Sequence, residues 1–365
     1  MQDSEIHNVN IEEIRSIKTP LELIKQLPLV PKVRHNVLWG RKAIRQILSG
    51  EDNRLLVIVG PCSIHDPVVG YDYAQRLVEL AVRIQDRVLV VMRVYFEKPR
   101  TRIGWKGLIH DPELDGSLDM ETGFFKARAF LLQVVGLGLP AATEFVDVIT
   151  PQYIADVVSW AAIGARTAES QTHRQLASGL SMPVGFKNGT GGSIQIAVNG
   201  VVAAGSRHGF LSIDGNGQVA QVISQGNQSC HIVLRGSEVR GPNHQAESVA
   251  EADRILKKAG VSPRLVVDCS HDNSGKDHTK QAGVFNDVME QRLTGNTNIV
   301  GLMLESYINA GSQTFKVGME PSQLQRGVSI TDACIDWEET EELLLWAYQS
   351  LVSTVPGWWN PVVDE

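Results

Sequence analysis

The chain of 365 residues has few cysteines, no long apolar run and no excess of positive charge. Its four cysteines, Cys62, Cys230, Cys269 and Cys334, are too scattered for the disulfide framework of a secreted domain, so we expect reduced thiols. No apolar stretch approaches the roughly 20 residues of a membrane-spanning helix, and the polar, acidic start lacks the pattern of a signal peptide. The net charge of −7 argues against a nucleic-acid-binding face, which needs dense positive charge. We therefore predict a soluble cytoplasmic protein with no nucleic-acid or membrane partner.

Compact cofactor motifs are missing as well. The glycine-rich segment at 189–193 follows Lys187 but lacks the Lys-Ser/Thr ending of a Walker A loop, and no complete GxGxxG motif follows the first expected strand. The chain also has no HExxH motif. Nucleotide binding is therefore not expected, and any metal site must be assembled from residues far apart in the sequence.

Short apolar runs recur along the chain, with helical patterns between them. Runs that are apolar on both faces are typical of parallel strands covered by helices. We expect eight such strands at Leu55–Val59, Val88–Val94, Ala141–Thr143, Ala162–Ala165, Val184–Phe186, Ile232–Leu234, Leu265–Val267 and Ile299–Leu304. Eight strands with crossover helices predict a (β/α)8 TIM barrel, although periodicity alone leaves an open doubly wound sheet as an alternative.

Three segments lie outside this repeat. Residues 1–50 form an N-terminal extension, with a helix expected at Val33–Leu48, and the catalytic barrel is predicted at 51–350. Phe210–Ile213 and Val219–Ile223 flank an Asp-Gly-Asn-Gly turn, which predicts an inserted β-hairpin at about 208–225. The Pro- and Trp-rich tail, 351–365, is not expected to be regular structure.

Residues that can ionise or bind a metal stand at the end of every expected strand. They are Cys62, Arg93, Glu144, Arg166, Lys187, Arg235, His271 and Glu305. Each alone is more often a surface charge or a packed side chain. In a barrel, however, the carboxyl ends of the strands meet on one face, where active sites are built.

The chemistry of this set indicates anionic substrates and a metal. Arg93, Arg166, Lys187 and Arg235, with Lys98 and Arg100, are suited to phosphate and carboxylate groups, and two anionic substrates would satisfy them. Cys62, His271 and Glu305, with Asp332 beyond the last strand, offer a thiolate, an imidazole and carboxylates, which suit a divalent transition metal.

Long motifs carry a family resemblance. GPCSIHD at 60–66, MRVYFEKPRTRIGWKGL at 92–108, IGARTAESQTHR at 163–174, PVGFKNGTGG at 183–192, DCSHDNS at 268–274, ES at 305–306 and SITDACIDW at 329–337 occur in order. Together they resemble the type I (alpha) heptulosonate-7-phosphate synthases over roughly residues 15–348. The family's fold is a (β/α)8 barrel.

The resemblance implies a transferase at the entry to aromatic amino-acid biosynthesis, in the shikimate and chorismate pathway. It implies that phosphoenolpyruvate, D-erythrose 4-phosphate and water give 3-deoxy-D-arabino-heptulosonate 7-phosphate (DAHP) and phosphate. By the resemblance, Mn²⁺, Fe²⁺, Co²⁺ or Zn²⁺ is held by Cys62, His271, Glu305 and Asp332. Phosphoenolpyruvate is bound by Arg93, Lys98, Arg166, Lys187 and Arg235 with Glu144 nearby, and Arg100 and Thr101 bind the phosphate of erythrose 4-phosphate. Lys98 is the candidate proton carrier.

The resemblance also implies a homodimer or homotetramer inhibited by an aromatic amino acid, with phenylalanine or tyrosine favoured over tryptophan. The matching effector region comprises Phe145, Asp147, Val148, Pro151, Gln152, Leu176, Leu180 and Ser181. Three departures alter loops beside the site: Gly191 replaces a usual Asp, Arg102 a common Thr, and 235–244 differs from the usual pattern. Two alternatives stay open, a sister synthase for another aldehyde, such as arabinose 5-phosphate or an N-acyl mannosamine, and a non-catalytic effector-binding partner of another pathway enzyme.

Overall fold

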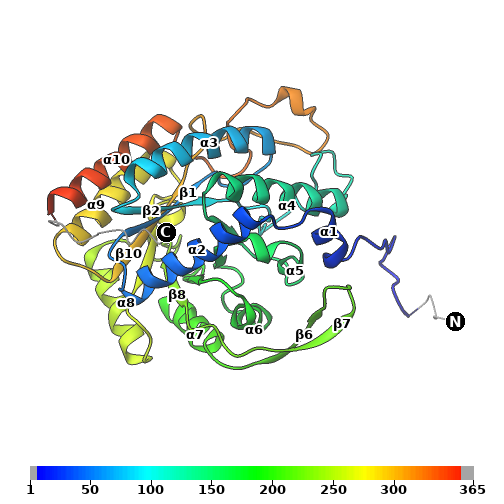
Figure 1. The fold of residues 1–365 in the computed structure, drawn as a ribbon, viewed down its shortest axis with the longest axis horizontal. Coiled ribbons are helices and arrows are strands. Elements are labelled where there is room, and N and C mark those ends of the chain that lie inside the picture. Colours follow the sequence, from blue (N-terminus) through cyan, green and yellow to red (C-terminus); the bar gives the residue numbers. More distant parts are fainter. Residues whose placement is uncertain (1–5, 355–365) are drawn as a thin grey trace.

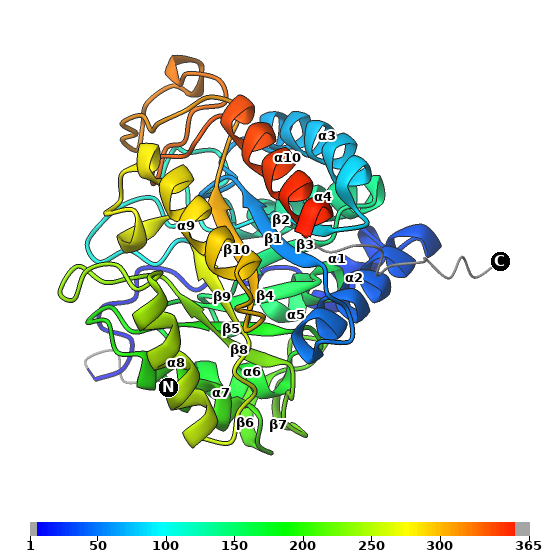
Figure 2. The ribbon, with the colours of Figure 1, turned by 90° about the vertical axis from the view of Figure 1, so that its left-hand side faces the viewer.

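The computed structural model describes residues 6–354, and at its centre eight parallel strands form a closed barrel (Figures 1 and 2). The strands follow one another around the barrel in the order β1-β10-β9-β8-β5-β4-β3-β2. They are β1 (Leu55–Gly60), β2 (Val88–Arg93), β3 (Ala141–Glu144), β4 (Trp160–Ile163), β5 (Val184–Lys187), β8 (Cys230–Leu234), β9 (Leu265–Asp268) and β10 (Ile299–Glu305). The predicted (β/α)8 barrel is therefore confirmed.

Helices surround the barrel and connect its strands (Figure 2). They are α1 (Pro20–Gln26), α2 (Pro31–Ser49), α3 (Pro67–Ile84), α4 (Met120–Leu137), α5 (Pro151–Ile154), α6 (Gln171–Gly179), α7 (Ile194–Ala204), α8 (Ala246–Lys258), α9 (Gln281–Leu293) and α10 (Trp337–Thr354). Short 3-10 turns lie at Ala155–Val157, His271–Asn273, His278–Lys280 and Pro321–Gln323. No helix within residues 6–354 is both long and apolar enough to cross a bilayer.

The fourth strand differs from its prediction. The run Ala162–Ala165 was expected, whereas β4 covers Trp160–Ile163 and pairs with Ala142 and Val184 of its neighbours through Trp160 and Ala161. Gly164 instead begins a turn, because its carbonyl accepts from the backbone N–H groups of Thr167 and Ala168. The other seven strands agree with their predictions to within two residues.

The predicted hairpin is confirmed, with β6 (Gly209–Ile213) and β7 (Val219–Ile223) paired antiparallel. It projects from the barrel (Figure 1), and its turn meets the N-terminal segment, where Leu21 N donates to Gly215 O over 2.8 Å. Helix α10 extends to Thr354, and the remainder of the predicted tail, 355–365, lies outside the described residues.

Helix α2 closes the amino-terminal mouth of the barrel. Its buried side chains Ala43, Ile44, Ile47 and Leu48 form one apolar cluster with inward-facing strand residues such as Ile58. Outward-facing residues of the same strands pack under the surrounding helices in a second cluster. The interior of the barrel is therefore completed by a helix from the N-terminal extension.

A buried histidine lies at this closed end. Trp160 Nε1 donates to His231 Nε2 over 3.1 Å, so Nε2 carries no proton, and Nδ1 lies 3.2 Å from the Ser229 carbonyl. Burial lowers the pKa of His231 from 6.5 to about 4. His231 is therefore neutral in the folded protein at pH 7.

We expect His231→Gln to reduce the loss of stability in acid. Between pH 6.5 and about 4 the unfolded chain binds a proton at His231 that the folded chain does not bind, so the free energy of unfolding falls as pH falls. One such group contributes about 1.4 kcal/mol per pH unit. Denaturant titrations at pH 7 and pH 5 measure the change, with the exposed His35→Gln as control. An undiminished loss in His231→Gln would contradict the assignment.

Candidate active site

The carboxyl ends of the strands bring most of the predicted residues to one face of the barrel. Arg93, Glu144, Lys187 and Glu305 are the last residues of β2, β3, β5 and β10, and Arg235 directly follows β8. Cys62 and His271 stand in the turns after β1 and β9. This face is where barrel enzymes place their active sites.

Cys62, Glu305 and Asp332 form a compact group of metal-binding side chains, whose ligand atoms all lie within 4.8 Å of one another. His271 stands beside this group, with Nε2 3.8 Å from Glu305 Oε1. Its other ring nitrogen, Nδ1, lies 2.9 Å from Asp268 Oδ2. A carboxylate behind one ring nitrogen is the usual support for a metal-binding histidine. The donor set therefore fits the predicted divalent ion.

Local backbone geometry presents these side chains. His271 adopts a φ of +52°, in the left-handed region that non-glycine residues seldom enter. The loop that carries Asp332 is bound to the Cys62 turn, because Asp332 N donates to Cys62 Sγ over 3.4 Å and the hydroxyls of Ser63 and Thr331 are 2.8 Å apart. The predicted ligands Cys62 and Asp332 are thus held together by contacts between distant segments.

Lys98 lies against the thiol of Cys62. Its Nζ donates to Cys62 Sγ over 3.0 Å and to the Cys62 carbonyl over 3.1 Å. Burial, with a smaller contribution from Glu305, raises the pKa of Cys62 to about 12, and Lys98 acts in the opposite direction. Burial would lower the pKa of Lys98, but Cys62, Glu305 and Asp332 outweigh it and raise that pKa. Lys98 is therefore a cation that carries a proton at this site.

Arg93 and Glu305 form a fully buried ion pair, with Arg93 Nη2 2.9 Å from Glu305 Oε1. Burial would raise the pKa of Glu305, but the charges of His271, Arg93 and Lys98 outweigh it and hold that pKa well below its usual range. The Arg93 guanidinium also lies 3.9 Å from the centroid of the Tyr95 ring. Glu305 is thus an anion available to a metal ion.

Lys187 lies between two buried acids. Its Nζ is 3.4 Å from Glu144 Oε2 and 3.6 Å from Asp268 Oδ2. Burial would raise the pKa of both acids, but cations lower it, chiefly Lys187 for Glu144 and His271 for Asp268. Alternating buried charges therefore extend from the metal-binding group to β3 and β5.

The predicted phosphate-binding residues lie farther out. Arg166 is exposed three residues beyond β4, and its Nε donates to Thr101 Oγ1 over 3.1 Å. Arg100 is exposed, with its guanidinium beside Gly104. Arg235 is buried, and its Nη1 pairs with Asp272 Oδ2. The structure thus brings Arg166 and Thr101 together, and it pairs Arg235 with an acid that the sequence reasoning did not single out.

Three buried asparagines connect the loops that carry the site, and sequence reasoning missed them. Asn188 Oδ1 accepts from Arg235 N over 2.8 Å and from Asn243 Nδ2 over 3.1 Å. Asn273 Oδ1 accepts from Asn243 N over 2.7 Å. Gly236 is required among them, because a Cβ there would lie 2.7 Å from Asn273 N and its φ is +72°. The only signal for this network was that Asn188 and Asn273 follow strand ends.

Tyr95 is a second missed residue. Its buried ring has the Arg93 guanidinium 3.9 Å, and the Lys98 and Lys187 ammonium groups 5.9 and 5.7 Å, from its centroid. An aromatic face attracts cations at such distances. The ring therefore forms an apolar floor beneath three of the predicted phosphoenolpyruvate-binding residues.

The predicted effector residues divide between the interior and the surface. The buried members are Phe145, Pro151 and Leu176, and the exposed members are Asp147 and Ser181. Gln152 Nε2 lies 3.4 Å from Ser212 Oγ of the hairpin. Val148 and Leu180 are half-buried. Pro151, Gln152 and Ser181 also line a cavity of about 370 Å³ shared with α2. The residues thus lie near both the hairpin and the N-terminal extension.

This region is bonded to the active-site segment. Glu97 accepts from the backbone N–H groups of Val146 and Asp147, each over 3.2 Å, and from Thr150 Oγ1 over 3.1 Å. Glu97 directly precedes Lys98. The 146–150 segment is therefore hydrogen-bonded directly to Glu97, the residue before Lys98.

Comparison with known proteins places this chain in a family. The family model described as the DAHP synthetase I family matches residues 25–345. The chain belongs to this family. The family predicted from the sequence is thus confirmed, and the chain is an enzyme of the DAHP synthase type.

Individual relatives are similar over almost their whole length. The Tyr-sensitive phospho-2-dehydro-3-deoxyheptonate aldolase of Escherichia coli K12 is 49% identical, over 96% of this chain and 98% of that protein. The Phe-sensitive and Trp-sensitive enzymes of the same strain are each 50% identical, over 92% and 91% of this chain and 95% and 94% of their own length. A solved structure of the aldolase from Francisella tularensis SCHU S4 matches with a TM-score of 0.90 and 45% identity, over 94% of this chain and 98% of that one.

One departure from the family pattern is sterically neutral in this DAHP synthase. A Cβ added at Gly191 would meet no atom within 4 Å. Its φ is also outside the left-handed region. The backbone thus does not require glycine there, and the loss of the usual Asp changes charge rather than shape. Arg102 is exposed beside Thr101.

Proposed function

We propose that this DAHP synthase condenses phosphoenolpyruvate with D-erythrose 4-phosphate and water to give DAHP and phosphate, in a metal-dependent first step of the shikimate pathway. The observation that carries the proposal is the Cys62, Glu305 and Asp332 group, whose Glu305 pairs with buried Arg93, on the same barrel face as buried Lys187. Metal-binding side chains and buried cationic side chains on one barrel face suit a reaction between two phosphorylated substrates.

Cys62, His271, Glu305 and Asp332 would hold the ion, with Mn²⁺, Fe²⁺, Co²⁺ and Zn²⁺ all suited to this donor set. When bound, it supplies Lewis-acid polarisation of the aldehyde oxygen. The charges of Arg93, Lys187 and Arg235 bind the phosphate and carboxylate of phosphoenolpyruvate, with Arg166 at the outer edge. Arg100 and Thr101 bind the phosphate of the aldehyde substrate.

In the reaction, C3 of the enol phosphate forms a bond to the aldehyde carbon, and the aldehyde oxygen takes up a proton. Lys98 is positioned to deliver that proton, because it is a cation at the metal-binding group. Water adds at C2, and the tetrahedral product then breaks its C–O bond to release phosphate. The fixed cations Arg93, Lys187 and Arg235 stabilise the negative charge on the departing phosphate.

The test measures phosphoenolpyruvate consumption by the purified protein, first with a chelator and then with Mn²⁺ restored. We expect consumption only when both erythrose 4-phosphate and metal are present. Arabinose 5-phosphate and N-acetylmannosamine serve as control aldehydes. Turnover with either control but not with erythrose 4-phosphate would overturn the substrate assignment, and metal-independent turnover would overturn the metal site.

Asp272 is expected to act by positioning Arg235. The Asp272 carboxylate and the Gly236 carbonyl both accept from Nη1, which leaves the opposite edge of the guanidinium available for a substrate phosphate. Asp272→Asn should raise the KM for phosphoenolpyruvate about tenfold, the scale of one charge-assisted hydrogen bond, with a smaller change in kcat. Initial-rate kinetics measure both constants, and Asp277→Asn, at the half-buried N-cap of the 3-10 turn His278–Lys280, is the control. Unchanged KM would contradict the role.

Regulation and assembly complete the proposal. An aromatic amino acid, with phenylalanine or tyrosine favoured, would inhibit through the region of Phe145, Gln152 and Ser181. The relatives' descriptions as Tyr-, Phe- and Trp-sensitive support this.

Exposed apolar residues on the hairpin, Leu211, Val219 and Ile223, support a homodimer or homotetramer, which light scattering would measure. The four free cysteines are all buried, and no helix of the described residues could span a membrane. Both findings are compatible with action in the cytoplasm.

A further inference from the structure

The side chain of Gln281, the first residue of α9, is bonded to the last residue of β10. Gln281 Nε2 donates to the Glu305 carbonyl over 3.0 Å, and Gln281 Oε1 accepts from the Glu305 N–H over 2.9 Å. The Gln281 side chain is fully buried. One amide therefore bonds both polar groups of the Glu305 main chain, and Glu305 is a predicted metal ligand.

This amide lies where β10 has no strand beside it. On one side β10 pairs with β1 as far as Glu305 itself, but on the other side its pairing with β9 ends at Met303 and Asp268. The Glu305 carbonyl also accepts from Ile335 N over 3.0 Å. Buried N–H and C=O groups need partners, and Gln281 supplies the acceptor and a donor that a neighbouring strand would otherwise supply.

The carboxylate of Glu305 is oriented by a second set of contacts. Arg93 Nη2 lies 2.9 Å from Oε1, and Ser270 Oγ donates to Oε2 over 2.7 Å. Both Arg93 and Ser270 are buried. Each carboxylate oxygen therefore has a donor, while the main chain that carries it is bonded to the amide. The direction of this carboxylate depends on both sets of contacts.

Gln281 also closes the loop that carries His271. The chain leaves β9 after Asp268, presents His271 in a 3-10 turn, and returns to the barrel at the start of α9. One end of this loop is joined to β9 by the peptide chain, and the other end is joined to β10 by the Gln281 amide. The predicted ligands His271 and Glu305 are therefore connected through one loop that is fixed at both ends.

The chemistry of the position requires an uncharged amide. The Glu305 N–H needs an acceptor and the Glu305 carbonyl needs a donor, and a glutamine side chain offers both. A carboxylate at this position would place an acceptor against the carbonyl and a second charge near buried Glu305. An apolar side chain would remove both hydrogen bonds, and a buried polar group without its partner is costly.

We infer that Gln281 is a positioning residue of the metal site. By bonding the Glu305 main chain, it holds the Glu305 carboxylate where Cys62 and Asp332 can bind the same ion. The inference rests on the proposed function, because the ion is the one proposed for this site. Without the amide, the end of β10 would have to be ordered when the ion binds, and that ordering lowers affinity. Gln281 thus acts through Glu305.

The experiment measures the dissociation constant of Co²⁺ by competition with a chelator, on the full chain after metal removal. Gln281→Met deletes both hydrogen bonds at nearly the same side-chain size and should raise the constant about 10–100-fold, the usual effect of residues behind a metal ligand. Gln281→Asn keeps an amide that is too short to bond both groups. It is the milder variant, which decides the question if Gln281→Met does not fold, and it should raise the constant about tenfold.

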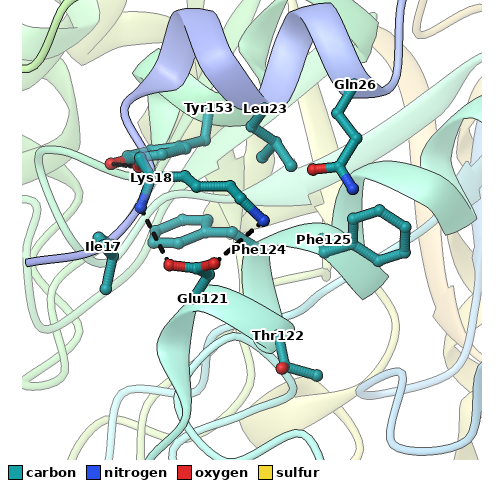
Figure 3. Close-up of a pocket in the computed structure, with 9 residues that line it drawn as sticks. All are labelled: Ile17, Lys18, Leu23, Gln26, Glu121, Thr122, Phe124, Phe125 and Tyr153. Atoms are coloured by element: carbon teal, nitrogen blue, oxygen red, sulfur yellow. Dashed lines mark hydrogen bonds and ion pairs between the residues drawn. The ribbon is translucent and has the colours of Figure 1, made fainter.

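Gln26→Met is the matched control. Gln26 is exposed, and its amide faces the space of a surface cavity between the N-terminal segment and α4, away from the metal-binding group (Figure 3). We expect its Co²⁺ dissociation constant to equal that of the unmodified protein.

Two further readouts separate positioning from a general effect on folding. Gln281→Met retains all four predicted ligands, so its rate of phosphoenolpyruvate consumption should return to near the unmodified value at saturating Co²⁺, whereas Cys62→Ala should not recover. Urea denaturation measures the stability of each metal-free variant. The inference is overturned if the Gln281 variants bind Co²⁺ as tightly as the unmodified protein, whatever their stability, or if the rate stays low at saturating metal. Failure of the unmodified protein to bind Co²⁺ would overturn the proposed metal site and this inference together.

Discussion

Cys62→Ala is expected to remove most of the metal and nearly all of the activity. The substitution deletes the only sulfur ligand of the compact group and leaves Glu305 and Asp332 with His271 beside them. Replacement of residues behind a metal ligand costs about 10–100-fold in metal affinity, and loss of a ligand should exceed that. Loss of Lewis-acid stabilisation worth several kcal/mol corresponds to a rate lower by about a thousandfold or more.

The measurements are metal content by elemental analysis and the initial rate of phosphoenolpyruvate consumption, both on protein dialysed against the same buffer. Cys230→Ala is the matched control, because Cys230 is a buried free thiol at the other end of the barrel. We expect the control to keep full metal content and rate. If Cys62→Ala also keeps both, Cys62 is not a ligand, whereas retained metal with a lost rate would assign Cys62 to proton handling beside Lys98.

Arg128→Met is expected to lower the free energy of unfolding by about 3–5 kcal/mol, the usual cost of removing one partner from a buried ion pair. Arg128 is fully buried, and its two terminal nitrogens donate to the Asp156 carboxylate over 2.6 and 2.8 Å. It also satisfies the carbonyls of Leu27 and Tyr153. The substitution deletes all four of these hydrogen bonds, although Asp156 is partly exposed and recovers some hydration.

Guanidinium denaturation followed by circular dichroism measures this loss, and limited proteolysis near Leu27 measures release of the N-terminal segment. Arg83→Met is the control, because Arg83 pairs with Glu341 on the surface and exposed pairs contribute at most about 1 kcal/mol. Equal losses in the two variants would show that Arg128 acts as an ordinary surface cation.

The strands were predictable because burial on both faces leaves a direct record in the sequence. Leu55–Val59 and Ile299–Leu304 are apolar and buried, and each strand extends only one residue beyond the predicted run. The fourth strand was misplaced because its small residues continue into Gly164 and Ala165, where only backbone hydrogen bonding distinguishes strand from turn. Composition cannot record that distinction.

Residues at the strand ends could be found in the same way, since barrel topology alone brings Arg93, Lys187 and Glu305 to one face. The asparagines were not predictable, because Asn188, Asn243 and Asn273 are far apart in sequence and polar residues in loops are common. The pairing of Arg235 with Asp272 has the same origin. Such contacts depend on how three loops pack, and a single sequence does not contain that information.

The helix that closes the barrel has a consequence for engineering. The last turns of α2 belong to the same apolar cluster as Ile58 and Trp160, so α2 is part of the barrel core and cannot be removed without exposing that core. A deletion that removes α2 would open the amino-terminal end of the barrel and expose its apolar interior to water. Forms of the protein that lack α2 should therefore aggregate. Helix α2 and the barrel fold as one unit.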